Sequence, residues 1–238
     1  MVNRMVQTAL FMAVAALIGA VLYWQVDVIY RGGPVMIPIV MCSVFSLALI
    51  MERLYYFFTL HLGPDSDRHF EQLRAALESH RWRDAETLSD AWRGPPARVV
   101  RAGLAVREAS PQDIDEAMTE AAHEEMPKVE QHLRWLSTLA QVSTLLGLLG
   151  TVTGLVRAFQ VIQTKSVGGN PVSPGDLAGG VWEALLTTVA GLTVAIPTIL
   201  AYNYFAGRVA EVQFQMEKAA ALVSGWRVMK GRSLPPHQ

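Results

Sequence analysis

Four long stretches without a charged residue constrain this chain more than any other feature of its sequence. Residues 5–26, 32–51, 135–156 and 184–207 contain no Asp, Glu, Lys or Arg, and they are 22, 20, 22 and 24 residues long. A helix needs about 20 apolar residues to cross a bilayer. One such stretch fits inside a soluble core, but four in 238 residues leave too little chain to cover them. The sequence therefore predicts an all-α polytopic membrane protein with about four transmembrane helices.

Charge and cysteine content exclude other classes of protein. Charged residues make up 17% of the chain, whereas a soluble domain carries about 25%. Twenty basic and 21 acidic residues give a net charge of −1, so the chain has no basic footprint for nucleic acid. Cys42 is the only cysteine, which excludes an intrachain disulfide.

The first stretch is expected to remain as a helix, because it ends in Tyr23-Trp24-Gln25 rather than in the small residues of a signal-peptide cleavage site. Basic residues near the span ends then predict that both termini are cytoplasmic. In that orientation eight basic residues flank the spans on the inside and three lie outside. The inner residues are Arg4, Arg53, Arg68, Lys128, Arg134, Arg208, Lys218 and Arg227, and the outer ones are Arg31, Arg157 and Lys165.

This topology divides the chain into five segments. They are an N-terminal extra transmembrane helix and outer loop (1–33), a second transmembrane helix (34–61), a cytoplasmic helical region (62–134), two transmembrane helices joined by a short periplasmic loop (135–204), and a cytoplasmic C-terminal helix and tail (205–238).

Helix signals outside the spans predict long helices that extend into the cytoplasm. Short helices are expected over 67–80, 84–92 and 97–108, and Ser110-Pro111 starts a longer one. This last helix is expected to run, bent near Pro127, directly into the third span. Behind the fourth span, apolar residues recur every three or four positions and predict a helix packed against a partner, such as the 110–134 helix. They are Phe205, Val209, Val212, Met216, Ala219, Val223 and Trp226.

Small and hydroxyl residues form one face of the third span. They recur at steps of three and four residues: Thr144, Gly147, Thr151, Gly154 and Ala158. Gly150 adds a G-x-x-x-G pair with Gly154, a common device for close helix packing in membranes. The spacing alone fits either close packing or a narrow polar pore face.

The fourth span opens with Trp182-Glu183, so that Glu183 lies at or inside its outer end, and it continues through Thr187, Thr188, Thr193 and Thr198. A charged side chain costs about 2.5–3.5 kcal/mol at the centre of a span, so an ionisable residue there is a candidate for function. Glu183 can equally lie among the headgroups or stabilise the start of its helix, and the spacing leaves these alternatives open.

The middle of every span lacks a titratable residue. A chain that moved protons alone would need a titratable relay there, so a partner would have to supply it. His123-Glu124-Glu125 lacks the second histidine of a zinc helix. We therefore expect no enzyme activity, no metal and no cofactor.

Three segments resemble the MotA/TolQ/ExbB proton channel family, and the ExbB/TolQ branch most closely. Together they cover about residues 34–210. The first segment contains GGPVMIP at 32–38 and MERLYYF at 51–57. The second contains LGLLGTVTG at 146–154, followed by Ala158-Phe159. The third contains LAGG at 177–180, Glu183-Ala184-Leu185, Thr188, AGL at 190–192, AIP at 195–197 and AYN at 201–203.

The resemblance implies a pentameric ring of this chain in the bacterial inner membrane, around the helices of an ExbD- or TolR-like single-span partner. The partner supplies a titrating Asp, and proton flow drives a TonB- or TolA-like protein in the periplasm. Thr151 matches the family's pore threonine, and Thr188 and Glu183 match the Thr and Glu of the next helix. The resemblance thus favours an ExbB-like subunit that energises TonB-dependent outer-membrane transport.

The additional span at residues 5–24 departs from the three spans of typical ExbB and TolQ proteins. A TolQ-like envelope motor and a MotA-like stator subunit, which has four spans, remain alternatives. A structural membrane scaffold is the alternative from a different class, because small-residue faces can simply hold helices together.

Overall fold

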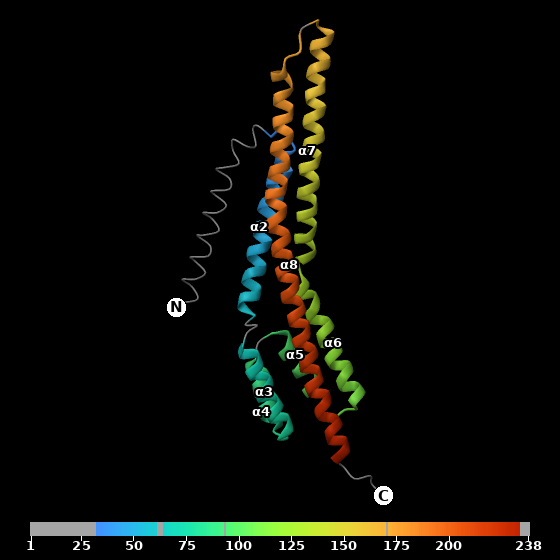
Figure 1. Cartoon of the computed structure of the whole chain (residues 1–238). Helices are drawn as coiled ribbons and strands as arrows, with labels where there is room; N and C mark the ends of the chain where they lie inside the picture. Colours follow the sequence, from blue (N-terminus) through green and yellow to red (C-terminus); the bar gives the residue numbers. More distant parts are fainter. Residues whose placement is uncertain (1–31, 61–63, 93, 170, 234–238) are drawn as a thin grey trace. The chain divides into compact units, whose positions relative to one another are not determined.

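The computed structural model describes residues 32–60, 64–92, 94–169 and 171–233, with the side chains of 64–66 and 226–233 left out of the description. These residues form helices joined by turns, which confirms the all-α prediction (Figure 1). The helices are α2 (Met36–Thr59), α3 (Pro64–Glu78), α4 (Trp82–Ala91), α5 (Pro95–Ala105), α6 (Pro111–Glu130), α7 (Leu133–Val167) and α8 (Pro174–Ser233).

Three segments of the described chain are long and apolar enough to cross a membrane. They are Met36–Thr59, Pro111–Val167 (which joins α6 and α7) and Pro174–Gly225. These segments include the second, third and fourth of the predicted spans, whereas the predicted first span at 5–26 lies outside the described residues. The protein is therefore a multi-pass membrane protein.

The chain forms two compact units. Among the described residues, unit 1 comprises those up to Ile50 together with Trp135–Tyr202, and unit 2 comprises those of Met51–Arg134 together with those from Asn203 onward. Both α2 and α8 contribute to the two units. Unit 1 contains most of each described apolar stretch, whereas unit 2 contains the short helices and most of the charged residues.

The core of unit 1 forms where α2 meets α7 and α8. Met36, Ile39 and Cys42 of α2 are buried together with Val194 of α8. Leu139, Leu146, Ala190 and Val35 pack around them. Apolar side chains on the outside of the unit, including Leu148, Phe159, Leu185 and Leu200, are 59–65% exposed, as expected for surfaces that face lipid or other subunits.

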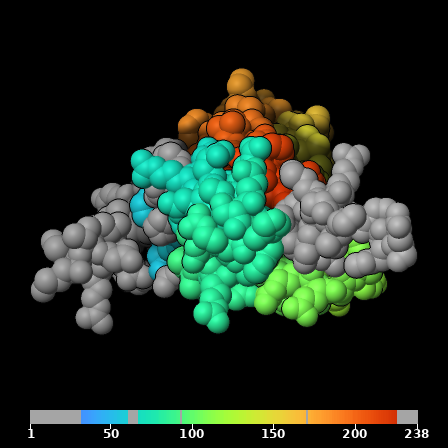
Figure 2. Space-filling model, turned by 90° about the horizontal axis from the view of Figure 1, so that it is seen from below, coloured from blue at the N-terminus to red at the C-terminus, as the bar shows by residue number. Residues whose placement is uncertain are grey.

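The short helices of unit 2 build a separate core. The ring of Phe70 in α3 meets Trp92 edge to face at 4.8 Å between centroids, and α3, α4 and α5 lie together in Figure 2. A Cβ atom on Gly103 of α5 would lie 2.8 Å from Sδ of Met118 and 3.0 Å from Cγ1 of Val223. Gly103 therefore allows α5, α6 and α8 to approach one another closely.

The apolar stripe of α8 is buried, which confirms that this helix packs along one face. The six side chains of the stripe from Phe205 to Val223 are each 0–8% exposed. The side chain of Trp226, the last residue of the stripe, lies outside the description. The partner is not the 110–134 helix alone. The ring of Phe205 stacks on Phe57 of α2 at 5.7 Å, and Lys218 lies over the ring of Phe70 and binds Asp67 of α3.

A capping box starts α6, as the sequence predicts. The Ser110 hydroxyl accepts a hydrogen bond from the backbone N–H of Asp113, and the Asp113 carboxylate accepts one from the backbone N–H of Ser110. These bonds satisfy donors that the first turn of a helix leaves unpaired. Hydrogen bonds from Ser110 lower the pKa of the Asp113 carboxyl below 3.8. The bond from the hydroxyl has the largest effect, and the bond from the backbone N–H has the next largest.

The prediction of one helix bent near Pro127 is wrong. Pro127 lies inside α6, which continues to Glu130, and the chain breaks at Gln131 and His132 before α7 begins. His132 has a φ of +64°, which the right-handed helix cannot accommodate. The carboxylate of Glu52 lies 2.8 Å from Nδ1 of His132, and the buried Arg53 donates to the carbonyl of Val129 at 3.4 Å. These contacts stabilise the break between α6 and α7.

Candidate functional site

The glycines predicted on the third span lie where α7 and α8 approach most closely. A Cβ atom on Gly154 would lie 2.6 Å from the carbonyl oxygen of Gly180, and one on Gly147 would lie 3.3 Å from Cα of Thr188. A Cβ atom on Gly150 would overlap the hydroxyl of Thr187. The small residues therefore let the two backbones touch, as in other close helix pairs of membranes. Figure 1 shows α7 and α8 side by side along unit 1.

Thr188 joins the two helices through its hydroxyl. The hydroxyl donates to the carbonyl of Gly147 across the contact at 3.1 Å, with the carbonyl of Ala184 in its own helix at 3.3 Å. The side chain is half-buried. Because a hydroxyl has one donor hydrogen and two acceptor lone pairs, Thr188 keeps the ability to accept a hydrogen bond.

Thr151 and Thr144 bond within α7 itself. Thr151 donates to the carbonyl of Leu148 at 2.6 Å and is half-buried, and Thr144 donates to the carbonyl of Ala140 at 3.1 Å and is exposed. The oxygens of both side chains remain able to accept a hydrogen bond. The predicted face therefore has two parts, with the glycines in the helix contact and these threonines beside it.

Thr187 is one residue of this region that sequence reasoning did not single out. It is 0% exposed, and its hydroxyl donates to the carbonyls of Glu183 and Ala184 in its own helix. Its sequence signal was its place in a run of threonines, which it shares with Thr188. Only the arrangement of two helices reveals that Thr187 fills the space above Gly150.

Glu183 lies inside a helix and not at its start. Because α8 begins at Pro174, Glu183 is more than two turns from the helix N-terminus and does not cap it. Its carboxylate forms an ion pair with Arg157 of α7. Sequence reasoning placed Arg157 among the basic residues of an outer loop, but α7 continues to Val167.

Gly33 covers this ion pair. A Cβ atom on Gly33 would overlap Oε1 of Glu183 and would lie 2.9 Å from Nη1 of Arg157. Gly33 also has a φ of +67°, a conformation that side chains other than glycine rarely adopt. Both the backbone and the space at this position therefore require glycine.

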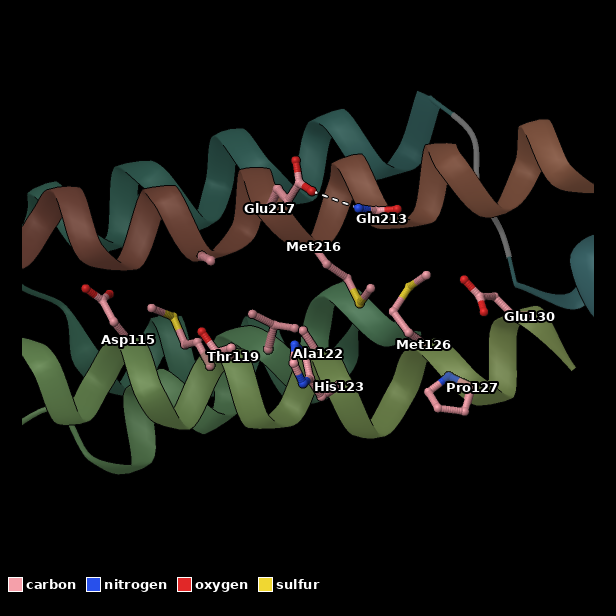
Figure 3. Close-up of a pocket in the computed structure, with 13 residues that line it drawn as sticks. Asp115, Thr119, Ala122, His123, Met126, Pro127, Glu130, Gln213, Met216 and Glu217 are labelled. Atoms are coloured by element: carbon pink, nitrogen blue, oxygen red, sulfur yellow. Dashed lines mark hydrogen bonds between the residues drawn. The ribbon is translucent and has the colours of Figure 1, made fainter.

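A groove in unit 2 lies between α6 and the C-terminal part of α8 (Figure 3). It has a volume of about 690 Å³, and Met126 and Met216 point toward one another across it. Its edges carry the carboxylates of Asp115, Glu130 and Glu217. The sequence-predicted site residues do not line this groove, and within the described residues His, Cys, Asp and Glu form no cluster of metal-binding size.

Comparisons of the sequence with known proteins point to one family. The MotA/TolQ/ExbB proton channel family matches residues 91–218 of the chain. The chain is 32% identical over 177 residues to biopolymer transport protein ExbB-like 3 of Synechocystis sp., covering 73% of this chain and 81% of that protein. It is 25% identical over 226 residues to biopolymer transport protein ExbB of Salmonella typhimurium, covering 85% and 83%.

A second group of relatives carries another name. The Tol-Pal system protein TolQ of Haemophilus influenzae is 36% identical over 97 residues, which cover 41% of each chain. The matched family consists of proton channels and not of enzymes. The chain therefore belongs to the MotA/TolQ/ExbB proton channel family, within its ExbB/TolQ branch.

Proposed function

We propose that this chain is the ring-forming subunit of a proton-driven motor in the bacterial inner membrane, with an ExbB-like role. The observation that carries the proposal is the uncharged part of the α7–α8 pair in unit 1, with the threonine hydroxyls Thr151 and Thr188 beside its closest contact. Neither hydroxyl ionises near neutral pH, so the titrating carboxyl comes from a partner helix.

The partner in this proposal is an ExbD- or TolR-like single-span protein whose intramembrane Asp takes up and releases protons. Thr188 already donates its hydrogen to Gly147, which leaves its oxygen to accept a hydrogen bond from the protonated Asp or from water. Thr151 does the same from α7. The threonines thus hold the acid while it is neutral, and Glu183 acts at the outer mouth.

Proton flow in this complex drives a TonB- or TolA-like protein that acts across the periplasm. The names of the relatives from Salmonella and Haemophilus support the two forms of this role, biopolymer transport for ExbB and the Tol-Pal system for TolQ. The ExbB-like role is favoured because that relative matches along 85% of this chain. A pentameric ring follows from the family resemblance.

A scaffold without proton transport is the second candidate, and a specific observation favours it. The glycine contact of α7 and α8 explains Gly147, Gly150 and Gly154 by packing alone. The two candidates differ in what the threonine oxygens do, since a scaffold uses the Thr188 hydroxyl only as a donor to Gly147 and needs no oxygen that accepts a hydrogen bond from an acid.

Replacing threonine by valine separates the candidates. Thr151→Val and Thr188→Val keep the shape and remove the hydroxyl, so the complex should assemble with its partner while proton-driven transport falls at least tenfold. Thr198→Val is the matched control, because Thr198 lies in the same helix but is 1% exposed and bonds to Val194. Transport is measured in cells, with purification of the partner as the test of assembly. Full transport in both variants would contradict the proton pathway.

A further inference from the structure

Every charged side chain in the described part of unit 1 binds another across the α7–α8 hairpin. Arg157 binds Glu183, and Nζ of Lys165 lies 2.5 Å from Oδ1 of Asp176. The other described residues of the unit are uncharged. Lys165 and Asp176 lie close to the connection between the helices, whereas Arg157 lies on α7 about two helical turns further from that connection. The Arg157–Glu183 pair is therefore the last charged contact before the uncharged part of the two helices.

The two partners of this pair are buried to different extents. The side chain of Glu183 is 14% exposed, whereas that of Arg157 is 44% exposed. The carboxylate lies beneath Gly33 and has the guanidinium as its only counter-charge among the described groups. Because a buried charge without a partner is strongly unfavourable, the charge of Glu183 depends on Arg157.

Holding the helices together does not require the pair. The glycine contacts at Gly147 and Gly154 already bring α7 and α8 together at backbone distance. A buried ion pair adds little stability, since the cost of removing both charges from water offsets their attraction. A pair at this place therefore points to a role beyond packing.

We propose that Arg157 is the positioning residue of Glu183, and that the pair under Gly33 is an outer gate that opens when Glu183 takes up a proton. This inference rests on the proposed function. A proton that binds to the carboxylate removes the negative charge that holds Arg157, so the neutral carboxyl leaves the guanidinium. When the proton passes inward to the carboxylate of the partner, Glu183 regains its charge and the pair re-forms.

No other charged group of the described unit takes part in this step. Lys165 and Asp176 bind each other, and Asp176 also accepts from the backbone and hydroxyl of Ser173. Arg157 stays charged throughout, because a guanidinium does not lose its proton in proteins. One proton is bound and one is released in each cycle.

The test compares stability with proton flow in the full-length chain, purified with its single-span partner and reconstituted into vesicles that contain a pH-sensitive dye. Arg157→Met should lower the thermal midpoint by roughly 5 °C or more, because it leaves the Glu183 charge unpaired, and it should reduce proton uptake at least tenfold. Arg157→Met combined with Glu183→Gln should restore the midpoint without restoring uptake. Arg157→Lys keeps the charge and should retain partial uptake.

Gly33→Ala and Gly169→Ala form a matched pair of variants. Both glycines have a φ near +70°, but a Cβ atom would overlap Glu183 at Gly33 and would meet nothing within 4 Å at Gly169. Both alanines are strained by the backbone alone. Gly33→Ala should therefore reduce proton uptake well beyond the effect of Gly169→Ala, although Arg157 and Glu183 are both present.

Three results would overturn the gate. They are wild-type uptake in Arg157→Met, recovery of uptake together with stability in the double variant, and equal effects of the two glycine variants. Each of these results is compared with a wild-type complex that does take up protons. A wild-type complex without proton uptake would instead contradict the proposed function itself.

Discussion

At the scale of single residues, Gly150 lies in the contact between α7 and α8, where no space is left for a larger side chain. The side chain of Thr187 occupies the space that a Cβ atom on Gly150 would need. Gly150→Ala should destabilise the complex by about 1–3 kcal/mol, the usual effect of overpacking a tight contact. The measurement is the thermal midpoint of the complex in detergent.

Gly179→Ala is the control for this prediction. Gly179 also lies in a helix, α8, but a Cβ atom there would meet nothing within 4 Å. Alanine stabilises a helix interior by about 1 kcal/mol relative to glycine, so this variant should be as stable as the wild type or more so. A destabilised Gly179→Ala would show that glycine at these positions has a cause other than the helix contact.

Residue types in the site were predictable from the sequence, whereas their pairing was not. The spacing of Gly147, Gly150 and Gly154 indicates a small face on one helix, but periodicity carries no information about the helix opposite. The partner of Glu183 was missed for a related reason. The charge-free stretch ends before Arg157, and the helix continues past that boundary.

At the scale of helices, the capping box of α6 offers a direct test of local structure. Ser110→Ala should lower stability by about 1 kcal/mol, because the first turn loses the hydroxyl that satisfies one of its N–H groups. Thermal unfolding of the purified chain in detergent at pH 7 measures this loss. An unchanged midpoint would show that the start of α6 contributes nothing to the folding of unit 2.

The same cap should depend on pH. The pKa of the Asp113 carboxyl is lowered in the folded chain, so its bonds to Ser110 stabilise the fold above the unfolded value of about 3.8 and are lost as the pH falls through the lower folded value. The difference between the wild type and Ser110→Ala should therefore shrink as the pH falls below about 3.8. A difference independent of pH would mean that the bond from the Asp113 backbone to the Ser110 hydroxyl is the only important one.

The apolar stripe of α8 predicts a strong effect of a charge on its buried side. Val212 is 0% exposed, so Val212→Asp should cost several kcal/mol and lower the yield of folded protein. Phe214→Asp is the control, because Phe214 is 65% exposed on the same helix. If the two variants give the same yield of folded protein, the folding of unit 2 does not depend on burial of the stripe.

Helix boundaries were predictable where a local signal marks them. Ser110-Pro111 marks the start of α6, and the structure begins the helix at Pro111. Pro127 is a weaker signal, because a helix can continue through proline where its neighbours compensate for the lost hydrogen bond. The break at His132 instead depends on Glu52 and Arg53, which are about 80 residues away in the chain, so no local pattern could reveal it.

At the scale of the whole molecule, charge distribution was the most informative property. The charge-free stretches predicted the three long apolar segments that the structure describes, because a bilayer requires both length and the absence of charge. The division between units falls at residues 50/51, 134/135 and 202/203, within a few residues of the ends of these stretches. The side of the membrane on which unit 2 lies stays a prediction.

Reporter fusions test that topology. A reporter after Gln238 and one inserted near Gly94 should be cytoplasmic, and one near Gly169 should be periplasmic, because eight basic residues flank the spans inside and three lie outside. Gly94 and Gly169 are suitable sites, since each lies in a connection between helices where an insertion interrupts no backbone ladder. Arg157 and Lys165, two of the three outer residues, are paired with carboxylates, but acidic neighbours contribute little to topology. A periplasmic reporter near Gly94 would reverse the orientation, and it would then move the Arg157–Glu183 pair to the cytoplasmic side and contradict its role as an outer gate.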